Sequence, residues 1–151
     1  MKLLTEITES AEAEYITEGT EKKLYITGPF IAAEVVNKNG RFYPMSVVEP
    51  AVKTYHEEYI STNRALGELS HPSCPTISAE RACLFIKSLH REGNNFIGKA
   101  RVLDDLPMGK ILKGLVSEGV ACGVSTRALG SLSEDQRSGH KIVGADLKLI
   151  A

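Results

Sequence analysis

Short β-type runs separated by turn residues fill most of this 151-residue chain, and that pattern restricts the fold more than any other feature. The runs that predict strands are residues 23–36 (bent at Gly28-Pro29), 81–90, 95–102, 120–129 and 141–150. Glu92-Gly93-Asn94 joins two of them with the spacing of a β-hairpin turn. The sequence therefore predicts a chain dominated by antiparallel strands.

Two helices are predicted between these strands. Ser46 and Glu49 have the spacing of a capping box, which predicts a helix from Ser46 to about Ile60. A second helix is predicted from Pro107 to Glu118, because proline is favoured in a first turn. Regular βαβ alternation is missing, so we expect an α+β fold in which helices flank an antiparallel β-barrel or sandwich.

Composition and charge exclude several classes of protein. A hydrophobic content of 42% and a charged content of 25% are ordinary for a globular protein. No apolar run approaches the ~20 residues of a membrane span, and the N-terminus lacks the apolar segment of a signal peptide. Three cysteines fit a reducing compartment, and the scattered Lys and Arg residues do not favour a nucleic-acid partner. We expect a cytoplasmic protein without membrane or nucleic-acid partners.

The N-terminal segment differs in charge from the rest of the chain. Residues 1–21 contain six Glu and one Lys, whereas the remainder carries 17 basic and 13 acidic residues. This asymmetry predicts an acidic leader over residues 1–22, a possible propeptide, before a domain over residues 23–151. The leader repeats an aliphatic-Thr-Glu pattern at Leu4-Thr5-Glu6, Ile7-Thr8-Glu9 and Ile16-Thr17-Glu18. The chain ends within the last predicted strand, which predicts a domain truncated at its C-terminus.

Two residues are candidates for catalysis from their settings. His71 lies in a proline-containing loop close to the carboxylate of Glu68. Ser125 is surrounded by small residues, which allow main-chain N–H groups to approach an oxyanion. Judged by residue type alone, an ordinary loop histidine and an ordinary serine at a strand edge remain alternatives.

A metal site built from His71, Cys74, Cys83 and His90 is a further alternative. Their spacing fits zinc sites poorly, because such sites usually contain closely spaced cysteine pairs. Cys83 alternates with apolar residues and is expected in the core. The sequence also lacks a glycine-rich phosphate-binding motif, so neither a metal nor a cofactor is expected.

Three sequence blocks connect these candidates to a known family. They are Asn37–Pro44 (NKNGRFYP), Ala65–Pro72 (ALGELSHP), and Gly109–Leu112 (GKIL) followed by Gly123–Ser131 (GVSTRALGS). In this order the blocks resemble motifs of the prohead core proteases of T4-like tailed phages, over roughly residues 30–150. The resemblance implies a serine endopeptidase with a fold like that of the herpesvirus assemblin proteases, an antiparallel β-barrel flanked by helices. Thr126 departs from the family motif, which often has a second serine there.

The resemblance also assigns roles to particular residues. His71 is the expected general base and Ser125 the nucleophile. Asp146, a carboxylate within an apolar predicted strand, is chosen as the third triad member, and His140 is the second choice. Arg127 is the candidate for stabilising the oxyanion.

The same resemblance implies the substrates and the setting of the reaction. Proteases of this family often cut after Leu-x-Glu or Ile-x-Glu in scaffold and capsid proteins, inside the prohead that assembles in the host cytoplasm. Self-processing is then expected after glutamates that end such a tripeptide, namely Glu6, Glu9, Glu18 and Glu134. A homo-oligomer is expected as well. The alternative is a non-catalytic prohead core or scaffold protein that retains the protease fold.

Overall fold

The computed structural model describes residues 1–8, 11–70 and 76–151. In these ranges the chain forms, in order, β1 (Lys2–Thr8), β2 (Glu12–Glu18), β3 (Glu21–Ala32), β4 (Arg41–Phe42), α1 (Met45–Tyr55), the π-helical turn η1 (His56–Ile60), β5 (Leu66–Glu68), the 3₁₀ turn η2 (Ala79–Arg81), β6 (Ala82–Glu92), β7 (Asn95–Val102), α2 (Pro107–Ser117), β8 (Val124–Gly130), β9 (Leu132–Glu134), β10 (Lys141–Val143) and β11 (Lys148–Leu149). Glu9, His71 and Cys74, all singled out from the sequence, lie outside the described residues.

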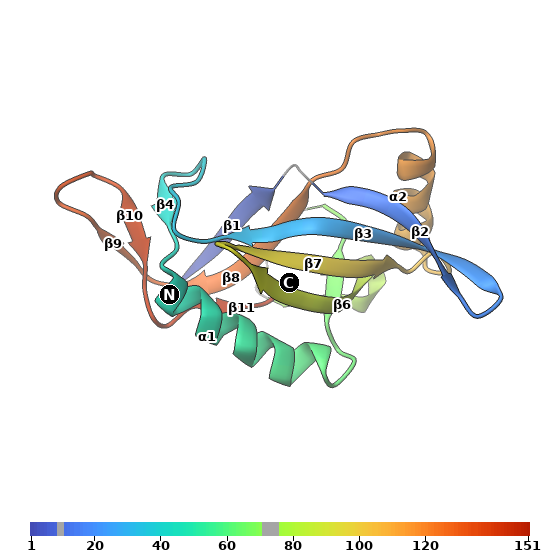
Figure 1. The fold of residues 1–151 in the computed structure, drawn as a ribbon, viewed down its shortest axis with the longest axis horizontal. Coiled ribbons are helices and arrows are strands. Elements are labelled where there is room, and N and C mark those ends of the chain that lie inside the picture. Colours follow the sequence, from blue (N-terminus) through green and yellow to red (C-terminus); the bar gives the residue numbers. More distant parts are fainter. Residues whose placement is uncertain (9–10, 71–75) are drawn as a thin grey trace.

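The strands form three sheets, and the largest runs along the long axis of the molecule (Figure 1). Its order is β2-β3-β7-β6-β5, and all its pairs are antiparallel. A second sheet has the order β1-β8-β11, and a third, β4-β10-β9, contains one parallel pair. The prediction of a mixed fold dominated by antiparallel strands is confirmed. The prediction of a barrel is wrong, because within the described residues the strands form three open sheets.

The two α-helices lie at different places on this framework (Figure 1). α1 packs against β11, and α2 packs against β6 and β7. The second helix confirms its prediction: Pro107 occupies the first turn, and the chain leaves the helix at Gly119, where φ is +84°. In the described part of the chain, neither helix has the length and apolar character needed to cross a bilayer.

The start of α1 differs from its prediction. Ser46 makes no cap, because the helix begins one residue earlier, after Pro44. The Met45 N–H donates instead to Glu34 Oε1 at 2.6 Å. A carboxylate from outside the helix therefore stabilises its first turn, where free N–H groups and the helix dipole favour negative charge.

Two predicted strand boundaries are also wrong. Residues 21–32 form one continuous strand through Gly28-Pro29, with a bulge between Pro29 and Ile31 where the pairing with β7 shifts. The last predicted strand, 141–150, is divided into β10 and β11, with a turn around Ala145 and Asp146. The turn changes the position expected for Asp146.

The acidic leader is part of the sheets and not a separate tail. β1 pairs with β8 over seven residues, and β2 pairs with β3. Leu4 is 1% exposed and belongs to the main core cluster. The expected boundary at residue 22 falls inside β3. Strand pairing and burial of Leu4 thus join the leader to the rest of the domain.

The core consists of two clusters, and Ala100 of the first and Val102 of the second face the same side of β7 in the large sheet. The first joins β1, β3, α1, β8 and β11, and its best buried members are Leu4, Ala33, Val48, Ala65, Ala100 and Val143. The second lies under α2 and contains Leu24, Ile26, Cys83, Val102 and Leu112. Residues 120–127 run beside the second cluster, because Cys122 and Val124 pack against it.

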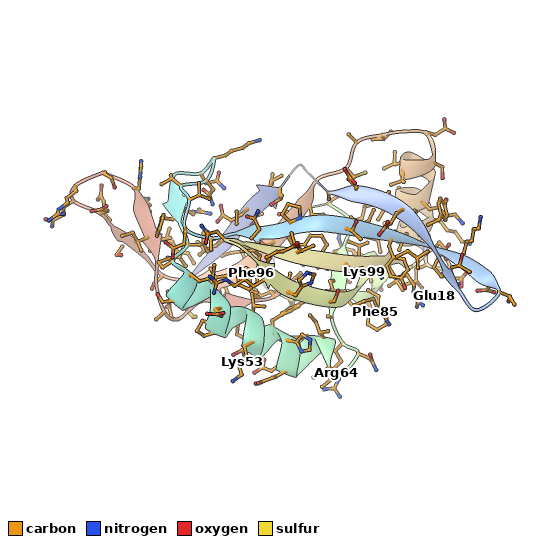
Figure 2. The ribbon with its side chains drawn as sticks, viewed as in Figure 1. Glu18, Lys53, Arg64, Phe85, Phe96 and Lys99 are labelled. Atoms are coloured by element: carbon orange, nitrogen blue, oxygen red, sulfur yellow. The ribbon has the colours of Figure 1, made fainter. Side chains whose placement is uncertain are left out.

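Cations lie over aromatic rings on one face of the large sheet (Figure 2). Lys99 Nζ is 4.8 Å from the centroid of Tyr25, and the Arg101 guanidinium is 5.8 Å from that of Phe85. Arg101 also forms an ion pair of 3.7 Å with Glu18 of β2. These cross-strand contacts connect the outer strand β2 to the centre of the sheet.

Gly109, in the first part of α2, gives a test of how tightly this helix is seated. A Cβ at this position would overlap the carbonyl oxygen of Leu103, which belongs to the backbone. We expect Gly109→Ala to lower the free energy of unfolding by about 1–3 kcal/mol in urea denaturation. Gly114→Ala in the same helix is the control, since nothing lies within 4 Å of its Cβ position. That control should raise stability by up to about 1 kcal/mol. Equal effects of the two substitutions would contradict the close contact between Gly109 and the Leu103 backbone.

Candidate active site

Ser125 is the second residue of β8, the central strand of the β1-β8-β11 sheet. Its Oγ is buried and has no hydrogen-bond partner among the described residues. A buried hydroxyl without a partner is costly, because it gives up hydrogen bonds to water without replacing them. Such a group is typical of a functional site, where a ligand or a further residue supplies the missing partner.

The Ser125 side chain borders a cavity of about 370 Å³. The walls come from the end of β5 and the residues after it, from β6 and α2, and from residues 120–127. Most of the lining is aliphatic, from residues such as Leu69, Leu84, Leu112 and Val124. An apolar cavity with a few polar groups is typical of an active site.

A buried ion pair forms part of this cavity. Arg127 lies two residues after Ser125 on the same face of β8, and its Nη2 donates to Glu68 Oε1. The two side chains are 5% and 2% exposed. Arg81 approaches the other carboxylate oxygen at 3.8 Å and donates to the Leu69 carbonyl at 2.9 Å. The pair thus connects the strand that carries Ser125 to the end of β5.

The segment that leads to His71 enters the same cavity. Glu68 ends β5, and both Leu69 and Ser70 line the cavity wall. Ser70, with φ of +68°, directly precedes His71 in the chain. His71 lies outside the described residues, so its role stays a prediction; the residues on its N-terminal side reach the cavity that holds Ser125.

Asp146 does not have the position expected of a triad member. It lies on an exposed turn, and its Oδ1 accepts hydrogen bonds from the Ser131 N–H at 3.0 Å and from Ser131 Oγ at 2.8 Å. These bonds hold the pKa of Asp146 below its usual value. Ser131 is six residues from Ser125 along an extended strand, a distance of about 20 Å. The premise of an apolar environment is wrong, and the carboxylate stabilises a turn far from Ser125.

His140, the second choice, is exposed in the connection between β9 and β10. Its carbonyl accepts a hydrogen bond from the Asp135 N–H at 2.8 Å. This connection follows the far end of β8, beyond Ser131. The structure therefore brings neither proposed third member to the Ser125 cavity.

Two of the four residues considered for a metal site, Cys83 and His90, lie in the described part of the chain, and they are far apart. Cys83 and His90 both lie on β6, seven residues apart, which corresponds to about 23 Å along a strand. One ion cannot be bound by both. Cys83 is buried, and burial with the nearby Glu68 charge raises the pKa of its thiol to about 11. The thiol is therefore protonated at neutral pH and is not an active nucleophile.

The glutamates considered for self-cleavage differ in exposure. Glu18 and Glu134 are exposed at strand ends, next to the β2–β3 turn and at the end of β9. Glu6 lies inside β1, and its carboxylate is bound by side chains of the Asn37–Pro44 block. Sequence reasoning missed both this contact and the Glu68–Arg127 pair. The two glutamates share one sequence signal, because each ends an aliphatic-x-Glu tripeptide.

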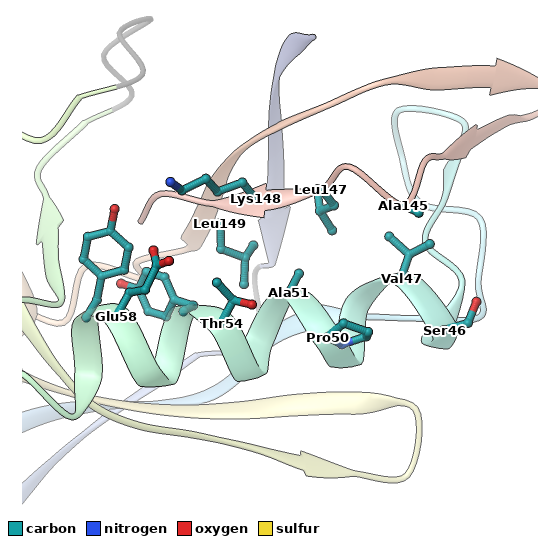
Figure 3. Close-up of a pocket in the computed structure, with 12 residues that line it drawn as sticks. Ser46, Val47, Pro50, Ala51, Thr54, Glu58, Ala145, Leu147, Lys148 and Leu149 are labelled. Atoms are coloured by element: carbon teal, nitrogen blue, oxygen red, sulfur yellow. The ribbon is translucent and has the colours of Figure 1, made fainter.

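A second hollow of about 340 Å³ lies between α1 and β11 (Figure 3). Its lining includes Val47, Pro50 and Ala51 of the helix and Leu147 and Leu149 across from them. Ser125, Arg127, His140 and Asp146, the catalytic candidates that the structure describes, do not line it. The Ser125 cavity is accordingly the candidate active site.

Comparison with known proteins gives a consistent result. The family model described as "Prohead core protein serine protease" matches residues 4–151. The prohead core protein protease of Enterobacteria phage T4 is 42% identical over 132 residues, which are 87% of this chain and 62% of that protein. The chain therefore spans about 62% of the length of this relative.

A solved structure agrees with the sequence match. The structure of the bacteriophage T4 capsid assembly protease, gp21, superposes with a TM-score of 0.91 at 37% identity. The match covers 99% of this chain and 94% of the other. The order of the three sequence blocks, the Ser125 cavity and these three matches lead to one conclusion: the chain belongs to the prohead core protein serine protease family.

Proposed function

We propose that this chain is a serine endopeptidase of the phage prohead, with Ser125 as its nucleophile and His71 as its general base. The observation that carries the proposal is the buried Ser125 Oγ, which lacks a partner among the described residues and borders an apolar cavity. The chain segment that enters this cavity continues directly into His71. Membership of the family supports the same assignment.

In the proposed reaction, His71 accepts the Ser125 proton as Oγ attacks the carbonyl carbon of the scissile peptide bond. The oxyanion that forms is stabilised by main-chain N–H groups near Ser125 and by the positive charge of Arg127. His71 then donates its proton to the leaving amine, and water hydrolyses the acyl-enzyme. Glu68 acts as a positioning residue, because its carboxylate binds the Arg127 guanidinium.

The proposed substrates are scaffold and capsid proteins within the assembling prohead in the host cytoplasm, cut after Leu-x-Glu or Ile-x-Glu. The T4 relatives are named as a prohead core protein protease and a capsid assembly protease, which supports this setting. Self-processing, a homo-oligomeric state and a resemblance to the herpesvirus assemblin proteases belong to the same proposal. Glu18, exposed beside the β2–β3 turn, is the most accessible self-cleavage site in the described part of the leader.

The test uses a peptide with the sequence of residues 11–22, which contains Ile16-Thr17-Glu18, and a matched peptide with Gln in place of Glu18. Mass spectrometry of the products should show cleavage after Glu18 in the first peptide and none in the second. Cleavage of both peptides would contradict the specificity. If the folded protein cuts neither peptide, the non-catalytic core or scaffold protein becomes the better interpretation.

A further inference from the structure

Four side chains of residues 37–43 converge on one carboxylate, that of Glu6 in β1. Asn37 Nδ2 and Asn39 Nδ2 donate to Glu6 Oε1 at 2.9 and 2.7 Å. Arg41 Nη1 donates to Oε2 at 3.0 Å, and the Tyr43 hydroxyl donates to the same oxygen. The Glu6 side chain is 15% exposed. Two amides, a guanidinium and a phenol surround this carboxylate, which is the arrangement of a carboxylate-binding site.

The donors are held in place by hydrogen bonds that do not involve Glu6. Asn37 Oδ1 accepts the N–H groups of Asn39 and Arg41 at 2.9 and 3.1 Å. The Asn37 carbonyl accepts the Gly40 N–H at 3.0 Å, in a turn where φ of Gly40 is +71°. The turn therefore presents its side-chain donors independently of the carboxylate that they bind. A prearranged site of this kind loses little entropy on binding.

The site contacts a tripeptide and not the glutamate alone. Leu4 is 1% exposed in the core, and the Thr5 carbonyl accepts a hydrogen bond from Asn39 Nδ2 at 3.1 Å. The first and third residues are thus recognised by their side chains, whereas the hydrogen bond to the middle residue reaches its backbone. This set of contacts selects the pattern aliphatic-x-Glu.

β1 occupies a position from which a strand can be exchanged. It is the edge strand of the β1-β8-β11 sheet, and Leu4 and Glu6 are paired with Ala128 and Thr126. Another extended segment can pair with an exposed strand edge through the same main-chain hydrogen bonds. The same pattern occurs in this chain at Ile16-Thr17-Glu18 and at Leu132-Ser133-Glu134.

We propose that the edge of β8 and residues 37–43 form a docking site for an extended aliphatic-x-Glu segment, and that β1 is its internal occupant. The ligand is such a segment of a protein substrate, and this assignment rests on the proposed protease function. We name this the glutamate docking site: Asn37, Asn39, Arg41 and Tyr43 with the β8 edge.

The docking site is separate from the cleavage site. Side chains alternate along β8, so Thr126 and Ser125 face opposite sides of the sheet. Glu6 lies opposite Thr126 and therefore enters the side away from Ser125. Docking of one aliphatic-x-Glu segment leaves the Ser125 cavity open to a second segment of the same substrate. Tethering by the first segment raises the effective concentration of the second.

The test weakens the binding of β1 to the docking site and leaves the donor side chains of residues 37–43 unchanged. In the Glu6→Gln protein, we measure binding of a fluorescent peptide with the sequence of residues 2–8 (KLLTEIT) by anisotropy. We expect it to bind about 10- to 100-fold more tightly than to the wild-type protein, because the neutral amide introduced in β1 competes less well for the site. A KLLTQIT peptide should not gain affinity, and adding Arg41→Ala should abolish the gain. Glu14→Gln, the same charge change on an exposed strand, should behave as wild type.

Equal binding of both peptides to folded Glu6→Gln protein, or no binding of either, would overturn the proposal. If Glu6→Gln does not fold, hydrogen–deuterium exchange on the wild-type protein decides. Excess KLLTEIT should accelerate exchange in residues 2–8, and excess KLLTQIT should not; unchanged exchange with KLLTEIT would overturn the docking site.

Failure of the docking site can be distinguished from failure of the proposed protease function. Cleavage after glutamate without peptide docking would refute the docking site alone. Docking without any cleavage by the folded protein would uphold the site as a binding surface and refute the protease function.

Discussion

Ser125→Ala is expected to reduce kcat/KM for an Ile-Thr-Glu peptide by about 10⁶-fold, since loss of the nucleophile removes the covalent step. The same substitution should leave stability unchanged or slightly increased. Ser125 Oγ is buried and has no hydrogen-bond partner among the described residues, so its removal breaks no bond and relieves an unsatisfied polar group. Rates followed by mass spectrometry and unfolding in urea provide the two measurements.

Ser133→Ala is the matched control, because Ser133 lies in β9, beyond the far end of β8. It should retain the wild-type rate. If Ser125→Ala retains cleavage, Ser125 is not the nucleophile. If it instead loses activity together with several kcal/mol of stability, Ser125 has a structural role and the assignment of a catalytic hydroxyl loses its basis.

The parts of the fold that sequence predicts well are those with local signals. The hairpin of β6 and β7 follows from its Gly93-Asn94 turn, and α2 follows from a proline at its start and Gly119 at its end. Each of these signals acts within a few residues. Local backbone preferences are therefore sufficient to specify the hairpin and the helix.

The parts that sequence predicts wrongly depend on distant residues. The excess of glutamate in residues 1–21 indicates a separate leader, yet β1 pairs with β8, more than a hundred residues away. The sequence singles out Glu6 only as a self-cleavage candidate, and the fold brings the Asn37–Pro44 block to its carboxylate. The start of α1 similarly depends on Glu34 and not on the local Ser46.

In the candidate site, too, some features follow from local sequence signals and others depend on distant residues. Motifs single out Ser125 and His71, and the burial of Ser125 beside a cavity supports a site around it. The prediction for Asp146 fails because alternation over residues 141–150 resembles one strand, whereas a turn at this position exposes the carboxylate. The pairing of Glu68 with Arg127 joins residues 59 positions apart, which no local pattern predicts.

Arg127→Ala is expected to lower the free energy of unfolding by about 3–5 kcal/mol, measured by urea denaturation. The substitution leaves the Glu68 carboxylate, 2% exposed, with Arg81 at 3.8 Å as its remaining cation among the described residues. A buried carboxylate that has lost its closest cation is far more costly than the absence of both charges. The double variant Glu68→Leu/Arg127→Met should therefore recover most of the lost stability, since apolar residues of similar size often replace a buried ion pair without cost.

Activity separates the two roles of this ion pair. If Arg127 stabilises the oxyanion, the double variant remains about 10²- to 10³-fold less active than wild type although it is folded and stable. If the pair serves only to hold β5 against β8, activity returns together with stability. The control is Arg91→Ala, which removes an exposed ion pair with Glu49 at 3.3 Å and should change stability by less than about 1 kcal/mol. A fully active double variant would remove Arg127 from the catalytic mechanism and leave the backbone N–H groups as the oxyanion donors.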